Sequence, residues 1–158
     1  MITLREDRPD DHALIAARQA RLYAQHYDWD GTYEALALKI LAAYAASRDP
    51  QRERGWIAEI NGDMVGCVFV MREDHDTARL RLLHVDTAAQ GHGLGRKLVR
   101  ECTAFARAAG YRRMLLWTQS TLLPARKIYA KEGYRLIKAE PHHSFGHDLV
   151  GETWELML

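Results

Sequence analysis

The stretch HVDTAAQGHGLGRKLV, residues 84–99, places Gly91, Gly93 and Gly95 within five positions and then continues into an apolar pattern. That pattern runs in steps of three and four residues toward Gly110, through Leu94, Leu98, Cys102, Phe105 and Ala109. Such spacing predicts an amphipathic helix that ends at a glycine. Residues 78–85, ARLRLLHV, form an extended run before it, so the glycines lie between an expected strand and an expected helix.

The glycine cluster coincides with the first turn of that helix. The first N–H groups of a helix have no intrahelical partners and carry the positive end of the helix dipole, so they can bind an anion. Glycines let phosphate oxygens approach the main-chain amides and permit positive φ angles. Arg96 and Lys97 add positive charge one turn later. We therefore expect a phosphate or pyrophosphate here. The alternative is a tight connection that needs glycine for steric reasons only.

Two common phosphate-binding motifs do not match the spacing. A P-loop requires Gly-Lys followed by Ser or Thr, whereas Gly95 is followed by Arg96, Lys97 and Leu98. A dinucleotide-binding fingerprint requires Gly-x-Gly-x-x-Gly, and the third glycine here comes one position early. The turn therefore belongs to neither class.

The N-terminal half of the chain predicts a strand, two helices and a hairpin. These elements are expected at 2–6, at 11–25 and 32–46, and at 56–60 with 64–71. Asn61-Gly62-Asp63 joins the last two runs and is typical of a β-hairpin turn.

The C-terminal part predicts a strand, a short helix and two final strands. They are expected at 112–118, 123–133, 134–139 and 153–158. Pro124 near the start and Gly133 at the end are typical helix boundaries. This mixed order predicts an α+β or α/β fold with a central sheet covered on both faces.

Composition limits the classes of function. At 158 residues, without a linker, a repeat or a low-complexity tract, we expect a single domain over 1–158. Twenty-two Lys plus Arg face 21 Asp plus Glu, which gives no basic surface for nucleic acid. No run approaches the roughly 18 apolar residues of a membrane span, so we expect a cytoplasmic protein. Cys67 and Cys102 lack the close spacing of a metal or redox motif.

A family resemblance rests on two blocks. Gln90-Gly91-His92-Gly93-Leu94-Gly95 resembles the Gln/Arg-x-x-Gly-x-Gly/Ala signature of the GNAT superfamily of N-acyltransferases, and Ala125-x-x-x-Tyr129-x-x-x-Gly133-Tyr134 resembles its second block. Val85 stands where the family has an apolar residue at a splayed strand end. The element order fits along essentially the whole chain. The resemblance implies the GNAT fold, a mixed and mostly antiparallel sheet with helices on both faces.

A narrower resemblance is to the acetyltransferase half of bacterial proteins that fuse a MarR-type helix-turn-helix to a GNAT domain. It rests on the segments LYAQHYDW, RERGWIAE, MVGCVFV and PHHSFGHDLVGETWEL. We expect this chain to begin directly at the catalytic domain, without the DNA-binding half.

The resemblance assigns acetyl-CoA, as cosubstrate, to the end of the extended run 78–85 and to the glycine turn. The residues concerned are Leu83, His84, Val85, Gln90, Gly91, His92, Gly93, Leu94, Gly95 and Arg96. Within this set, the resemblance implies that the backbone of Leu83 binds the acetyl carbonyl and that the backbone of Val85 binds the pantetheine arm. It implies that residues 90–96 bind the pyrophosphate. Leu122 departs from the family, which often has an asparagine there.

The resemblance also implies direct transfer of the acetyl group to a primary amine, with Tyr129 as the catalytic acid beside the thioester sulfur. A thioester is already activated, so the enzyme chiefly positions the amine and stabilises developing charge. The base stays open. Arg79 and Arg81 stand where a carboxylate is common, which leaves His84, Glu59, His147 or a water. Neither cysteine has a basic neighbour, which disfavours ping-pong transfer.

The acceptor side is expected to include aromatic and basic residues, namely Tyr23, Tyr27, Trp29, Arg81 and His147. Arg81 alternates onto the same side as Leu83, where it could bind an acceptor carboxylate or form a structural ion pair. The histidines of PHHSFGH lack a fourth ligand, so no metal site is expected.

The acceptor itself is left open, either a small-molecule amine or a protein amine. We expect no nucleic-acid or membrane partner, and the final strands suggest a homodimer. The alternative function is a non-catalytic sensor or regulatory module that binds acyl-CoA.

Overall fold

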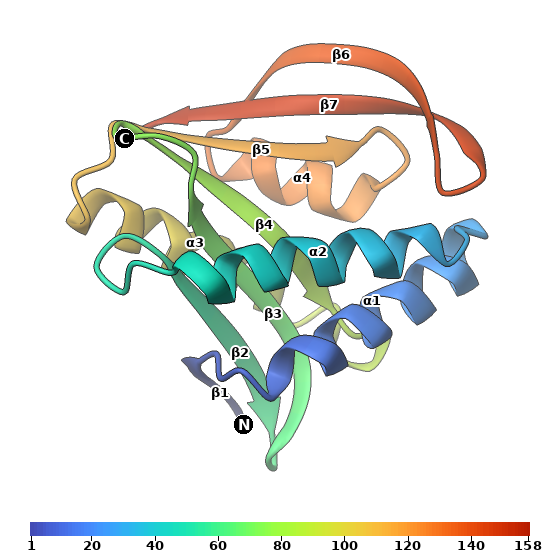
Figure 1. Ribbon diagram of the computed structural model, residues 1–158, viewed down its shortest axis with the longest axis horizontal. Coiled ribbons are helices and arrows are strands. Elements are labelled where there is room, and N and C mark those ends of the chain that lie inside the picture. Colours follow the sequence, from blue (N-terminus) through green and yellow to red (C-terminus); the bar gives the residue numbers. More distant parts are fainter.

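The computed structural model describes residues 1–158 as a seven-stranded sheet flanked by helices (Figure 1). The strands are β1 (Ile2–Glu6), β2 (Arg54–Ile60), β3 (Asp63–Arg72), β4 (Thr77–Val85), β5 (Arg113–Gln119), β6 (Arg135–Ser144) and β7 (His147–Met157). The helices are α1 (Asp11–Tyr27), α2 (Thr32–Ser47), α3 (Leu94–Ala108) and α4 (Leu123–Lys131), with a 3₁₀ turn η1 (Thr87–Ala89). None of the helices is both long enough and apolar enough to cross a lipid bilayer.

The sheet is mixed and mostly antiparallel, as the GNAT resemblance implies. Its order is β1-β2-β3-β4-β5-β7-β6, and only β4 and β5 pair in parallel. Their pairing ends at Leu80 and Leu116. Beyond that point β4 continues along β3 to Val85, whereas β5 continues along β7 to Gln119. The two strands therefore diverge and open a gap in the middle of the sheet (Figure 1).

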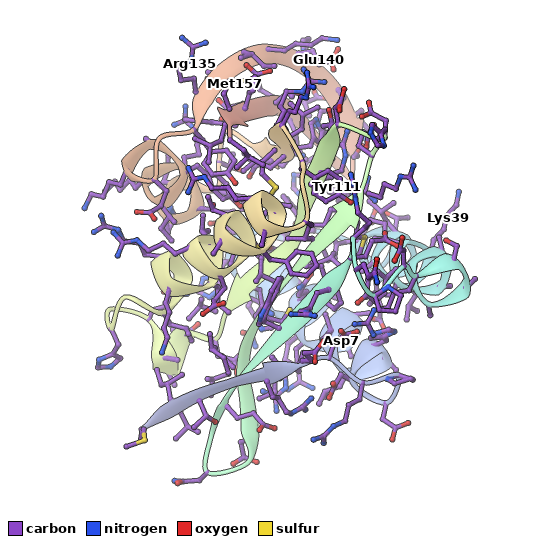
Figure 2. All side chains as sticks on the ribbon, turned by 90° about the vertical axis from the view of Figure 1, so that its left-hand side faces the viewer. Asp7, Lys39, Tyr111, Arg135, Glu140 and Met157 are labelled. Carbon is purple, nitrogen blue, oxygen red and sulfur yellow. The ribbon has the colours of Figure 1, made fainter.

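The helices form two layers, one on each face of the sheet. Figure 2 shows α3 on one side and α1 with α2 on the other. Helix α3 follows the predicted apolar spacing and buries Leu94, Leu98, Val99, Cys102 and Ala106. Helices α1 and α2 cover the opposite face, where Ile15 and Leu41 pack with Ile57 and Phe69 of the sheet. Burial of these apolar surfaces holds the diverging strands in place.

A β-bulge interrupts β4. Its register against β3 pairs Phe69 with Arg81 but Cys67 with His84, so β4 contains one extra residue. Leu82 lies at the bulge and has a φ of 58°. A bulge of this kind reverses the alternation of side chains that follows it.

The bulge corrects one expectation from the sequence. Arg81 was expected on the same side as Leu83, but the structure separates them. Arg81 lies on the face of α1 and α2, opposite Phe69, whereas Leu83 packs against the core on the α3 face. Strict alternation fails here because two successive residues, Arg81 and Leu82, lie on one face.

The last two strands are longer than predicted. They were expected at 134–139 and 153–158, but they extend over β6 and β7 and meet at Phe145 and Gly146. These two residues have φ angles of 58° and 84°, which is the pattern of a tight two-residue hairpin turn. Strand β6 is a sheet edge with mostly exposed side chains, so its sequence carries little apolar alternation.

Candidate active site

Two cavities meet where β4 and β5 diverge. The first has a volume of about 410 Å³ and the second about 430 Å³. Both are lined by Tyr23, Leu83, Leu122 and Ala125. These four residues define the junction of the cavities, the place where the two cavities lie next to each other.

The glycine turn, residues 90–96, lines the first cavity at the start of α3. The N–H groups of residues 91–96 donate no hydrogen bond within the protein, and the first backbone bond of the helix runs from Lys97 N to Gly93 O at 3.0 Å. Six consecutive free amides at the positive end of a fifteen-residue helix form an anion-binding surface. The geometry therefore fits a pyrophosphate.

The glycines of this turn serve two different purposes. Gly91 and Gly93 have φ angles of 85° and 75°, and a Cβ added to either would meet no protein atom within 4 Å. Their amides are thus open to a ligand. At Gly95, by contrast, a Cβ would lie 2.7 Å from the Cδ1 of Ile128. Gly95 therefore allows α3 to pack closely on α4, and a side chain here would require Ile128 to shift.

Other residues of the turn differ in what they offer a cofactor. The Gln90 side chain donates from Nε2 to the carbonyl of Val85 at 3.1 Å and fixes the turn against the end of β4. The His92 side chain is exposed, and His92 is the one residue of the turn that lines neither cavity. Arg96 lines the first cavity while its Nε lies 2.6 Å from Glu132. That ion pair fixes the orientation of the Arg96 guanidinium.

The end of β4 brings Leu83, His84 and Val85 to the first cavity. The imidazole of His84 is fully buried on the opposite side, with Nε2 2.9 Å from Asp86. Asp86 in turn pairs with Arg18 at 2.9 Å. The hydrogen bond from His84 holds the pKa of Asp86 below its usual value. His84 can therefore contribute its backbone to the cavity, whereas its ring is out of reach of a substrate.

Gln19 of α1 holds the bulge in its conformation, and the sequence analysis missed it. The side chain is fully buried. Its Nε2 donates to the carbonyl of Leu82 at 2.9 Å, and its Oε1 accepts from the hydroxyl of Tyr33 at 2.6 Å. A glutamine four residues after the buried Ile15, on the apolar side of a helix, is the signal that could have identified it.

We expect Gln19→Met to destabilise the protein by roughly 3 kcal/mol, because the Leu82 carbonyl and the Tyr33 hydroxyl would both lose a buried partner. Methionine keeps a similar length, so packing changes little. Urea unfolding followed by circular dichroism measures the difference. Gln51→Met, at an exposed position, is the control and should stay within about 0.5 kcal/mol of the wild type. An equal effect of the two substitutions would contradict the bracing role.

Tyr129 and Arg81 line the second cavity, among mainly apolar residues that include several aromatic rings. Tyr129 lies on α4 and is 5% exposed. Burial raises the pKa of its phenol well above the usual value, so the hydroxyl stays protonated at neutral pH. The side chain can therefore donate a proton or a hydrogen bond next to the junction.

The other predicted acceptor residues are spread over the two cavities. Tyr23 lines both, Tyr27 lines the first and Trp29 lines the second, where its ring packs 4.7 Å from that of Phe145. His147 lines neither cavity. Its Nε2 lies 2.8 Å from the carbonyl oxygen of Asp28 and joins the turn after β6 to the turn after α1. His147 is thus placed as a structural contact.

No carboxylate side chain lines either cavity. Glu59 lies on β2 and pairs with Arg5 at 3.1 Å, outside both cavities. With His84 buried and His147 outside the lining, this arrangement leaves water as the base among the candidates from the sequence.

The two thiols are placed as core residues. Cys67 and Cys102 are fully buried, and burial raises the pKa of both. A buried thiol with a raised pKa is a poor nucleophile. The three histidines of PHHSFGH also point to separate partners, His142 to Gln119, His143 to Asp148 and His147 to Asp28.

Comparison with known proteins gives one family. The model of the acetyltransferase (GNAT) family matches residues 10–134. The N-acetylaspartate synthetase of Danio rerio is 34% identical over 83 residues, which cover 52% of this chain and 29% of the relative. The chain therefore spans well under half the length of that curated relative.

Solved structures share the fold at low sequence identity. The ribosomal-protein-alanine N-acetyltransferase from Brucella melitensis has a TM-score of 0.79 at 18% identity and covers 99% of both chains. The yncA protein from Salmonella typhimurium, solved with its cofactor acetyl-CoA, has a TM-score of 0.76 at 21% identity, over 99% of this chain and 94% of that one.

Proposed function

The chain belongs to the acetyltransferase (GNAT) family, and on that premise we propose that it transfers an acetyl group from acetyl-CoA to a primary amine by direct attack. The observation that carries this proposal is the glycine turn, with its six free amides, beside the gap between β4 and β5. The names of the relatives, which describe N-acetylation, support it.

The first cavity has the features that acetyl-CoA requires. The amides of residues 91–96 would hold the pyrophosphate, and the end of β4 at Leu83 and Val85 would run beside the pantetheine arm. At the junction, Leu122 and Ala125 form an apolar wall of the cavity beside the pantetheine arm. Acetyl-CoA supplies the activated thioester, and the protein positions it at the junction of the cavities.

The amine would enter through the second cavity and meet the acetyl group at the junction. Alignment of amine and carbonyl in one site replaces a bimolecular encounter, which is the main contribution to rate in this kind of transfer. Tyr129 would protonate or hydrogen-bond the leaving sulfur, and a water would accept the proton of the amine. Both thiols are buried, which favours direct attack over an acetyl-cysteine intermediate.

Calorimetric titration with acetyl-CoA, followed by a panel of amines scored by release of CoA, tests the proposal. We expect saturable binding of acetyl-CoA and release of CoA with at least one amine class. Binding without release for any amine would favour the alternative of a non-catalytic acyl-CoA sensor. Folded protein that binds no acyl-CoA would overturn both.

Finer expectations from the sequence remain part of this proposal. They are a single acetyltransferase domain over 1–158, a cytoplasmic location, kinship with the acetyltransferase half of MarR-type fusions, and a homodimer. The acetyl-CoA contacts at Leu83, His84, Val85 and residues 90–96 are proposed through the backbone, with Arg96 as the one charged side chain.

A further inference from the structure

Arg81 lines the second cavity, and its guanidinium has no hydrogen-bond or ion-pair partner there. It is half-buried and makes no hydrogen bond or ion pair within the protein. Arg79, two residues earlier on the same strand and face, is different, because its Nε lies 2.7 Å from Glu73. Glu73 thus neutralises the charge of Arg79, whereas Arg81 has no ion-pair partner.

The one carboxylate that acts on the charge of Arg81 is that of Glu73, which is already paired with Arg79. The cavity is lined mainly by apolar side chains, and it contains no Asp or Glu. Burial, followed by the charge of Arg79, lowers the pKa of the Arg81 guanidinium. A cation held in apolar surroundings without a counterion is costly, and an anionic ligand relieves that cost. Since guanidinium binds carboxylate through two parallel hydrogen bonds, a carboxylate is the fitting anion.

The position of Arg81 relative to the junction suits an acceptor. It lies on β4 next to the last residue that pairs with β5, and Leu83 at the junction follows two positions later. A carboxylate bound to Arg81 would therefore hold a nearby amine toward the acetyl group. An α-amino acid carries both groups that this arrangement would use, a carboxylate for Arg81 and an amine for the acetyl group.

An aromatic wall completes the cavity on the side of α2. Trp29, Tyr33 and Phe145 contact one another, with Trp29 and Phe145 ring centroids 4.7 Å apart and Tyr33 and Phe145 5.4 Å apart. Trp117 lines the cavity from β5. Such a wall favours an apolar or aromatic side chain on the acceptor.

We propose that the acceptor is a free α-amino acid with an apolar or aromatic side chain, whose carboxylate binds Arg81. This inference rests on the proposed acetyl transfer and names its substrate class. A polyamine or an aminoglycoside is disfavoured, because the cavity offers positive charge and no carboxylate to a polycation. A peptide N-terminus is disfavoured because it has an amide in place of the carboxylate.

The test compares L-phenylalanine, L-phenylalaninamide and spermidine as acceptors at saturating acetyl-CoA. We expect kcat/KM for L-phenylalanine to exceed that for the amide by about 30-fold, as for a hydrogen-bonded pair with a charged group. Arg81→Gln should raise the KM for L-phenylalanine by a similar factor and leave the amide nearly unchanged. Arg135→Gln is the control, because Arg135 is exposed on β6 and lines neither cavity, and it should change the KM less than threefold.

A binding measurement separates this inference from the proposed transfer. Calorimetry should show that the wild type and Arg135→Gln each bind N-acetyl-L-phenylalanine about 30-fold more tightly than Arg81→Gln does. Equal use of the acid and the amide would overturn the inference while acetyl transfer stands. Binding of acetyl-CoA without release of CoA from L-phenylalanine would also overturn it. Loss of acetyl-CoA binding itself would remove the proposed function first.

Discussion

Gly93→Val is expected to weaken the binding of acetyl-CoA by about 100-fold while the protein remains folded. Gly93 caps α3 with a φ of 75°, and a β-branched residue adopts that conformation only under strain. The valine would either rotate the peptide, so that the row of amides no longer converges, or keep its conformation and place methyl groups over them. In both cases the pyrophosphate would lose several charge-assisted hydrogen bonds.

Gly62→Val is the matched control for this prediction. Gly62 has a φ of 83°, lies in the turn between β2 and β3, and has no protein atom within 4 Å of an added Cβ. The two substitutions should therefore cost a similar stability, about 1–3 kcal/mol, in urea unfolding. Only Gly93→Val should weaken acetyl-CoA in calorimetry.

A ligand without the pyrophosphate adds a second comparison. S-acetylpantetheine should bind Gly93→Val and the wild type with similar affinity, because it does not reach the glycine turn. Equal affinity of both glycine variants for acetyl-CoA would show that the free amides of residues 91–96 do not hold the cofactor.

Tyr129→Phe is expected to lower kcat by about 100-fold and to change KM less than threefold. Tyr129 lines the second cavity, and removal of a positioned acid costs 10²–10⁴ in rate. Because burial raises the pKa of the Tyr129 phenol, the hydroxyl stays protonated as pH rises above neutrality. Its deprotonation should therefore produce no decline in the wild-type rate up to about pH 10, the usual pKa of tyrosine.

Tyr134→Phe is the control for the acid. Tyr134 is also buried, its ring centroid lies 5.9 Å from that of Tyr129, and its hydroxyl has no hydrogen-bond partner. It lines neither cavity, so its hydroxyl should be dispensable for turnover. Steady-state kinetics of both variants with one acceptor, from pH 6 to 10, decide the matter. Equal kcat and an equal pH profile for Tyr129→Phe and the wild type would remove Tyr129 from the mechanism.

Local patterns in the sequence predicted most of the elements correctly. The first two helices were expected at 11–25 and 32–46 and extend over Asp11–Tyr27 and Thr32–Ser47. The hairpin around Asn61-Gly62-Asp63 and the strand–turn–helix at the glycines were also found. These features depend on hydrophobic periodicity and on turn residues, which act over a few neighbouring positions.

Features of the site that depend on distant contacts were not predicted. The bulge at Leu82 depends on Gln19, 63 positions away in the sequence, and it reversed the expected relation of Arg81 to Leu83. The length of β6 depends on its pairing with β7, because β6 is an edge strand whose side chains are mostly exposed on both sides.

The sequence by itself determined the order of the elements, the glycine turn and the family, because each of these is recorded in short stretches of neighbouring residues. Only the tertiary structure decided that the glycine turn with its free amides lines a cavity, that the ring of His84 is buried away from it and that Arg81 lines a second cavity without an ion-pair partner. The physical reason is that burial and pairing of a side chain depend on the elements packed around it, and here those elements come from both ends of the chain.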